Sequence, residues 1–96
     1  MRLDELEAVL LSHDAIADVA VVPSHDEEAG EVPKAFVVRS AELEADEVIS
    51  FAAQRLSPQK KVRRVEFVDE IPKSPSGKIL RRVLVDRERR AAERPG

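Results

Sequence analysis

The side chain best placed for chemistry is Lys78, in a run of twelve residues that reads Ile-Pro-Lys-Ser-Pro-Ser-Gly-Lys-Ile-Leu-Arg-Arg, residues 71–82. Prolines, serines and a glycine disfavour regular structure as far as Gly77, and an apolar and basic helical pattern begins at Ile79. We therefore expect Lys78 to lie where a loop becomes a helix. Such a junction has free backbone N–H groups and the positive end of the helix dipole, so it favours an anion.

The Gly77-Lys78 pair is also how a Walker A phosphate-binding loop ends. That loop requires a glycine five residues before the Gly-Lys pair and a serine or threonine directly after it. This chain has Pro72 and Ile79 at those two positions. A Walker A loop is therefore excluded.

The run instead resembles the lysine motif of the adenylate-forming superfamily, Pro-Lys-(Thr/Ser)-x-(Ser/Thr)-Gly-Lys-(Ile/Val)-x-Arg, which residues 72–81 match throughout. Acyl- and aryl-CoA synthetases, peptide-synthetase adenylation domains and luciferases carry this motif in a small C-terminal domain. Residues 17–23, 26–38 and 65–72 also resemble segments of that domain. In sequence, these segments are most similar to those of coumarate-type and fatty-acyl-type CoA ligases.

The resemblance implies a reaction in which a carboxylate attacks the α-phosphate of ATP, before CoA receives the acyl group. Lys78 would be the catalytic lysine, because a compact cation can offset the repulsion between the two anions. Without the motif, a lysine after a glycine is usually a solvated surface residue; the full match reverses those odds.

The neighbours of Lys78 have lesser expected roles. Ser76 and Gly77 lie in the loop that approaches the nucleotide cofactor, and we expect them to shape it, Ser76 as a helix cap and Gly77 as a joint. Arg81 and Arg82 are expected to be solvated or packed against a larger domain.

A second basic group comprises Lys60, Lys61, Arg63 and Arg64. In the family, the small domain rotates after adenylation and presents another face to the active site, where CoA binds. Lys60 and Arg63 are therefore candidate contacts for the phosphates of CoA. A solvated strand flank is the alternative.

ATP and CoA are the cofactors that the resemblance implies, with Mg²⁺ arriving with ATP in the complete enzyme. We expect no metal site within this chain. Its two histidines, His13 and His25, have no second histidine or cysteine at metal-ligand spacing.

The length of 96 residues allows one small domain, and we expect residues 1–96 to be a single C-terminal lid domain without the large N-terminal adenylation domain. Such a chain should be inactive alone. The composition, 43% hydrophobic with three aromatic residues and no cysteine, indicates an aliphatic core and excludes thiol catalysis. No apolar run approaches the ~18 residues of a membrane span, and the N-terminus is too acidic for a signal peptide. A cytoplasmic location is expected.

Charge is distributed unevenly along the chain, with 4 basic and 13 acidic residues in residues 1–59 and 12 basic and 6 acidic residues in residues 60–96. This asymmetry leaves an alternative, a stand-alone binding module whose basic half meets nucleic acid or a protein partner. The scarcity of aromatic residues for base stacking and the acids in the last helix weigh against nucleic acid.

Three helices and three strands are expected to position these residues. Helical apolar spacing predicts amphipathic helices from Leu3 to about Ser12, over residues 45–56 and from Ile79 onward. Runs rich in valine and isoleucine predict strands over residues 16–22, 35–38 and 62–68, the first two as an antiparallel pair. The predicted class is α+β, a three-stranded sheet with about three helices against it.

Finer expectations concern the ends and faces of these elements. Asp4 and Glu7 have the spacing of a helix-capping pair. Pro23 should stop the first strand, residues 24–31 should form a long connection, and Pro33 should lie outside the ladder or at an edge. In the last helix the apolar side chains Leu80, Val83 and Leu84 should face inward.

Overall fold

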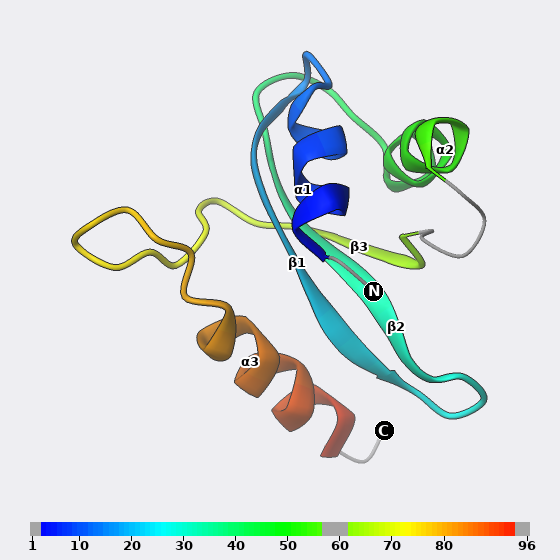
Figure 1. Ribbon diagram of the computed structural model, residues 1–96, viewed down its shortest axis with the longest axis vertical. Helices are drawn as coiled ribbons and strands as arrows, with labels where there is room; N and C mark the ends of the chain where they lie inside the picture. Colours follow the sequence, from blue (N-terminus) through cyan, green and yellow to red (C-terminus); the bar gives the residue numbers. More distant parts are fainter. Residues whose placement is uncertain (1–2, 57–61, 94–96) are drawn as a thin grey trace.

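The structure is a computed structural model that describes residues 3–56 and 62–93 (Figure 1). Its elements, in chain order, are α1 (Leu3–Leu11), β1 (Ile16–Asp26), β2 (Gly30–Arg39), α2 (Ala45–Arg55), β3 (Arg64–Phe67) and α3 (Arg81–Glu93). The strands form one sheet in the order β1-β2-β3, with β1 antiparallel and β3 parallel to the central β2. The predicted α+β class, three helices with a three-stranded sheet, is confirmed.

Helices cover both faces of the sheet, α1 and α2 on one and α3 on the other (Figure 1). In β1, Val19 and Val21 pack with α1 and α2, whereas Ala20 and Val22 pack on the side of α3. Because consecutive side chains of a strand point to opposite faces, burial on both sides explains the unbroken apolar run in β1.

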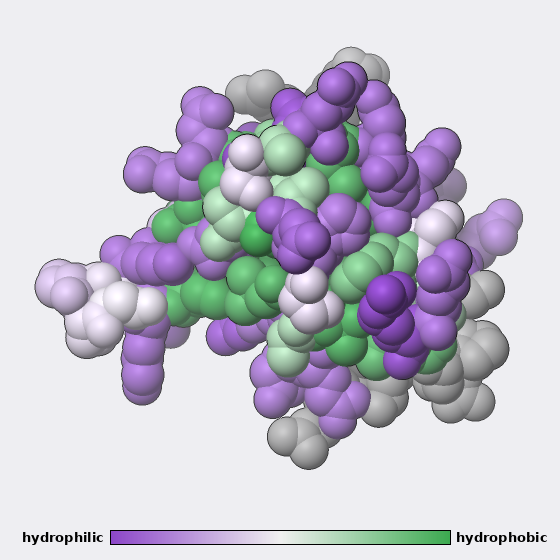
Figure 2. All heavy atoms as spheres, turned by 90° about the horizontal axis from the view of Figure 1, so that it is seen from above, coloured by the Kyte–Doolittle hydropathy of each residue, from purple (hydrophilic) through white to green (hydrophobic). Residues whose placement is uncertain are grey.

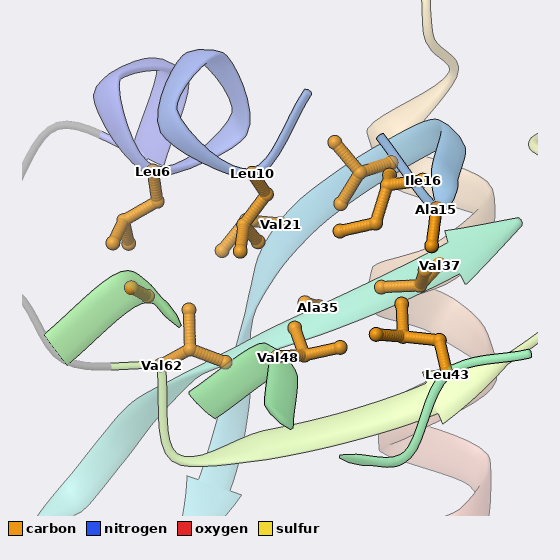
Figure 3. Close-up of a cluster of buried hydrophobic side chains, with 12 residues drawn as sticks. Leu6, Leu10, Ala15, Ile16, Val21, Ala35, Val37, Leu43, Val48 and Val62 are labelled. Carbon is orange, nitrogen blue, oxygen red and sulfur yellow. The ribbon is translucent and has the colours of Figure 1, made fainter. Parts of the chain in front are cut away.

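The side covered by α1 and α2 holds the larger core, here called the α1/α2 cluster (Figure 3). Its buried members are Leu6, Leu10, Ala15, Ile16, Val19, Val21, Ala35, Val37, Leu43, Val48, Ala52 and Val62. Val65 and Phe67 of β3 pack against it from partly exposed positions, which confirms that they share one face of the strand. The opposite side holds a smaller α3 cluster of Ala20, Val22, Phe36, Ile71 and Leu84.

The connection between β1 and β2 is shorter than the sequence predicted, because β1 continues through Pro23 and β2 begins at Gly30. Pro23 stands opposite Pro33 in the ladder. The carbonyl oxygen of Pro33 accepts the backbone N–H of Arg63 at 3.0 Å and therefore points away from β1. Because the N–H and the carbonyl of one strand residue lie on the same side, an N–H at Pro33 would also point away from β1. Neither proline therefore costs the β1–β2 pair a hydrogen bond, and the expectations for both were wrong.

Asp26 closes the short turn between these strands. Its Oδ2 accepts the backbone N–H groups of Ala29 at 2.8 Å and Glu28 at 3.2 Å. The bond from Ala29 is the main cause that lowers the pKa of the Asp26 carboxyl below its ordinary value of 3.8, and the nearby charge of Arg64 acts in the same direction. Gly30 completes the turn with φ of +84°, a region that favours glycine.

α3 begins at Arg81, later than the predicted start at Ile79. The reason is that Ile79 pairs with Lys73 in an isolated antiparallel bridge. Leu84 faces the sheet and is 2% exposed, but Leu80 and Val83 are 40% and 49% exposed. The expectation of three inward side chains was therefore wrong for two of them, and Val85 packs beside Leu84 in their place.

No helix in the described part of the chain is long and apolar enough to cross a membrane.

Candidate functional site: the lysine loop

The lysine loop, residues 73–79, projects from the body of the domain (Figure 1) and forms a pale protrusion in Figure 2. The bridge between Lys73 and Ile79 closes its base. Inside it, the Ser74 N–H donates to the Lys78 carbonyl and the Gly77 N–H donates to the Ser74 carbonyl, both at 2.9 Å. The loop is thus a compact hairpin whose shape comes from its own hydrogen bonds.

Two serines and a glycine set the conformation of the loop. The hydroxyl of Ser74 accepts the Lys78 N–H at 3.2 Å and shares a 2.9 Å hydrogen bond with the hydroxyl of Ser76. Gly77 has φ of +88°, and a Cβ built on it would meet nothing within 4 Å. Backbone conformation, rather than space, therefore favours glycine there. Ser76 does not cap α3 as expected, because α3 starts five residues later at Arg81.

Lys78 is exposed, and its ammonium group has no hydrogen-bond or ion-pair partner among residues 3–56 and 62–93. Lys78 does not lie at the helix start expected for it, because α3 begins three residues later at Arg81. The N–H groups of Gly77 and Lys78 are bonded within the loop, and the Leu80 N–H donates to the Pro72 carbonyl at 2.9 Å. An anion approaching Lys78 would therefore meet its side chain rather than the backbone N–H groups of Gly77 and Lys78.

The cation at the start of the loop is paired with an acid of the sheet. Lys73 Nζ lies 2.6 Å from Asp18 Oδ2 on β1. The other oxygen of Asp18, Oδ1, accepts the Val19 N–H at 2.9 Å. The base of the loop is thus attached to β1, an edge strand of the sheet.

The cation just after the loop is paired with an acid of α1. Arg81 forms an ion pair with Oε1 of Glu7, whose Oε2 accepts the Val21 N–H at 2.8 Å. Glu7 is 6% exposed, so its expected capping role was wrong. Arg81, expected to be solvated or packed against a larger domain, is paired with Glu7 and keeps 42% of its side chain exposed. Sequence reasoning missed this contact, although Glu7 occupies a position of the apolar stripe that Leu3, Leu6 and Leu10 define.

The second basic group lies away from the lysine loop, since the start of β3 and the loop are on opposite sides of the domain (Figure 1). Arg63 is exposed there. Arg64 is engaged by Asp26 at 3.1 Å, by the hydroxyl of Ser24 at 2.9 Å and by the His25 carbonyl at 2.7 Å. Lys60 and Lys61 lie outside the described residues. The structure therefore does not bring Arg63 and Lys78 together.

No group of three or more His, Cys, Asp or Glu side chains able to hold a metal ion occurs within residues 3–56 and 62–93. His13 accepts the Ala15 N–H at 3.0 Å through Nδ1 and packs edge-on against Phe51, with ring centroids 4.7 Å apart. Its neighbours give it a structural role in the turn before β1.

Known proteins resemble this chain in both sequence and structure. The 4-coumarate–CoA ligase of Pinus taeda is 59% identical over 83 residues, which cover 86% of this chain and 16% of that protein. The crystal structure of the acyl-CoA synthetase of Brucella canis matches with a TM-score of 0.89 and 34% identity, over 95% of this chain and 18% of that one. The fatty acyl CoA synthetase of Mycobacterium tuberculosis matches with a TM-score of 0.84 and 32% identity, over 91% of this chain and 18% of that one.

These relatives are CoA ligases and acyl-CoA synthetases, and the chain spans less than a fifth of the length of each. The sequence model of the AMP-binding enzyme C-terminal domain matches residues 5–78, a segment that ends on Lys78. The chain therefore belongs to the AMP-binding enzyme C-terminal domain family.

Proposed function

We propose that this domain is the mobile lid of an ATP-dependent CoA ligase and that Lys78 assists the adenylation step. In that step a carboxylate oxygen attacks the α-phosphate of ATP, an acyl-adenylate forms and pyrophosphate leaves. Both reactants are negatively charged, so a cation held between them lowers the barrier. The ammonium of Lys78 is suited to this because it can contact a carboxylate oxygen and a phosphate oxygen together.

The observation that carries this proposal is the contrast between Lys78 and the cations on either side of it. Lys73 and Arg81 are each paired with a carboxylate. Lys78 is exposed and has no partner in the described part of the chain. The charge available to an incoming anion at this loop is therefore that of Lys78. ATP and CoA would be bound mainly outside this chain, with Mg²⁺ accompanying ATP.

The same proposal assigns the second half-reaction to a different face of the domain. After adenylation the lid would rotate, and the start of β3 would approach CoA, with Arg63 and Lys60 as contacts for its phosphates. The separation of the lysine loop and the start of β3 supports such a division (Figure 1). Of the two neighbouring arginines, Arg63 is the better candidate, because Arg64 is engaged by Asp26 and Ser24.

The substrate class we propose is an aryl or fatty carboxylate. It follows the relatives, which include a 4-coumarate–CoA ligase and a fatty acyl CoA synthetase. The acyl pocket would lie outside this chain, so substrate choice within that class depends on residues elsewhere in the ligase.

The test compares the two half-reactions of the complete ligase that contains this domain. Lys78→Ala should slow acyl-adenylate formation by about 100-fold or more, the effect of removing one electrostatic contact to a transition state. Thioester formation from supplied acyl-adenylate and CoA should be unchanged. Pyrophosphate release measures the first half-reaction, and CoA consumption measures the second.

Arg89→Ala is the matched control, because Arg89 is an exposed cation of α3 away from the loop. It removes the same charge and should leave both half-reactions as they are. Equal loss of both half-reactions in Lys78→Ala would contradict the role proposed for Lys78, and so would an adenylation rate within a few-fold of the wild type.

A further inference from the structure

The two cations that flank the lysine loop are attached to different elements. Lys73, five residues before Lys78, contacts Asp18 of β1. Arg81, three residues after Lys78, contacts Glu7 of α1. The loop is thus anchored at both ends to parts of the chain that lie more than fifty residues earlier in the sequence.

Each acid is itself fixed by a second hydrogen bond. Asp18 accepts the Val19 N–H with the oxygen that does not contact Lys73. Glu7 accepts the Val21 N–H with the oxygen that does not contact Arg81. Both N–H groups belong to β1, one of the two edge strands of the sheet. The two carboxylates are therefore held in place by one strand, and each orients the cation it binds.

These contacts have two consequences for Lys78. They restrict the directions in which a projecting loop can move, since a hairpin joined to the body at both ends has less freedom than one joined by its backbone alone. They also pair the positive charges of Lys73 and Arg81 with carboxylates. The Lys73–Asp18 pair, with side chains 40% and 26% exposed, is a surface ion pair that adds little to global stability, so its effect should be on the position of the loop.

We infer that Lys73 and Arg81 are positioning residues, which together with Asp18 and Glu7 fix the direction in which Lys78 is presented. The structural part of this inference stands without any assigned reaction. Its catalytic part, that a loosened loop slows adenylation, rests on the function proposed for Lys78 above.

The structural part is tested on the 96-residue chain by backbone ¹⁵N relaxation at Gly77 and Lys78. The wild-type loop should have order parameters near the ~0.85 of rigid backbone, and Lys73→Met should lower them below ~0.6. Asp18→Asn should act in the same way, because the amide oxygen can still accept the Val19 N–H while the charge is lost. Lys73→Arg, which keeps a cation for Asp18, should keep the loop ordered. A loop that is already mobile in the wild type, or that stays rigid in both Lys73→Met and Asp18→Asn, would overturn the inference.

The catalytic part is tested in the complete ligase. Lys73→Met should lower kcat of adenylation by about tenfold or more, the effect expected for a misplaced catalytic group, and should leave KM for ATP and the thioester half-reaction unchanged. Lys73→Arg should keep most of the rate. Arg82→Ala, which removes an exposed cation next to the paired Arg81, is the control and should keep the wild-type rate.

The outcomes separate this inference from the proposed function. Equal loss of both half-reactions in Lys73→Met would mean that Lys73 only supports the fold, which overturns its positioning role. If Lys78→Ala were without effect while the relaxation data behaved as expected, the proposed function would fail and the anchoring of the loop would stand.

Discussion

The two faces of the sheet are held together differently. On the face covered by α1 and α2, twelve buried hydrophobic residues form a continuous cluster. On the face covered by α3, the buried cluster among the described residues has five members, and a network of charged groups lies beside it. There Lys34 contacts Glu66 at 2.9 Å and Glu88 at 2.7 Å, and Glu88 accepts the hydroxyl of Ser24 at 2.9 Å.

The lysine loop belongs to the second face. Ile71, just before it, is buried in the α3 cluster, and Ile79 at its end packs against that cluster. The free energy gained from apolar burial is large and does not depend on the direction of the contact. Ion pairs are directional, and their strength depends on salt and pH. The comparison indicates that the α1/α2 face supplies most of the stability, whereas the α3 face packs the apolar residues at the two ends of the lysine loop.

The largest effect expected from this comparison is on the apolar face. Leu10→Ala should destabilise the domain by about 3–5 kcal/mol, because it removes a fully buried side chain from a cluster that cannot close the cavity. Leu84→Ala should cost less, about 2–3 kcal/mol, since α3 can settle toward the sheet. Urea unfolding of the chain measures both. Val83→Ala, at an exposed site of the same helix, should change stability by ~0.5 kcal/mol or less. A larger loss in Leu84→Ala than in Leu10→Ala would reverse the comparison.

A smaller effect is expected on the polar face. Lys34→Met removes a cation whose side chain is 13% exposed and leaves the carboxylates of Glu66 and Glu88, 32% and 11% exposed, without it. The loss should be about 1–3 kcal/mol, below that of a fully buried pair because Glu66 is partly solvated and still contacts Arg87.

The double variant Lys34→Met with Glu88→Gln is the control for this network. It should be more stable than Lys34→Met alone, because the charge left without its main partner is removed as well. Equal stability of the two variants in urea would show that the network does not hold α3 against the sheet.

The smallest effect concerns the β1–β2 turn. The pKa of Asp26 is lowered in the folded chain, chiefly by the Ala29 N–H, so its carboxylate contributes stability above the ordinary pKa of 3.8 that is lost as pH falls through the lower folded value. The carboxyl ¹³C shift of Asp26 should therefore titrate below pH 3.8. Asp26→Asn should remove this part of the acid dependence of Tm. A titration midpoint above the ordinary value would contradict the turn geometry.

The number and type of the elements could be predicted because their apolar periodicity is regular. Leu6 and Leu10 mark the buried side of α1, and the alternation of Val65 and Phe67 marks that of β3. The continuous run in β1 predicted a strand but not that helices cover both of its faces. Periodicity reports which side chains are buried, and it does not report which element buries them.

Pairing across the sheet could not be predicted from local signals. Pro23 and Pro33 each read as a strand breaker, and only their position opposite one another in the ladder makes them harmless. The late start of α3 could not be predicted for the same reason. It depends on the bridge between Lys73 and Ile79, which joins residues on either side of a loop.

The candidate site could be predicted from a motif, but the ion pairs that hold its loop could not. The run around Lys78 is distinctive in sequence, whereas the contacts of Lys73 with Asp18 and of Arg81 with Glu7 join distant residues. A charged residue within an apolar helical stripe, as Glu7 is, was the signal that a buried partner existed.

The proposal that the Lys78 ammonium assists adenylation is tested by removing this cation and restoring it through chemical modification. Lys78→Cys in the complete ligase should lose adenylation, and alkylation of its sulfur with 2-bromoethylamine places an ammonium at the end of a side chain as long as that of lysine. This chain has no cysteine of its own, and wild-type ligase treated in the same way controls for cysteines elsewhere. Recovery of pyrophosphate release by about tenfold or more is the predicted result. A modified enzyme that still forms the thioester from supplied acyl-adenylate but regains no adenylation would contradict the claim.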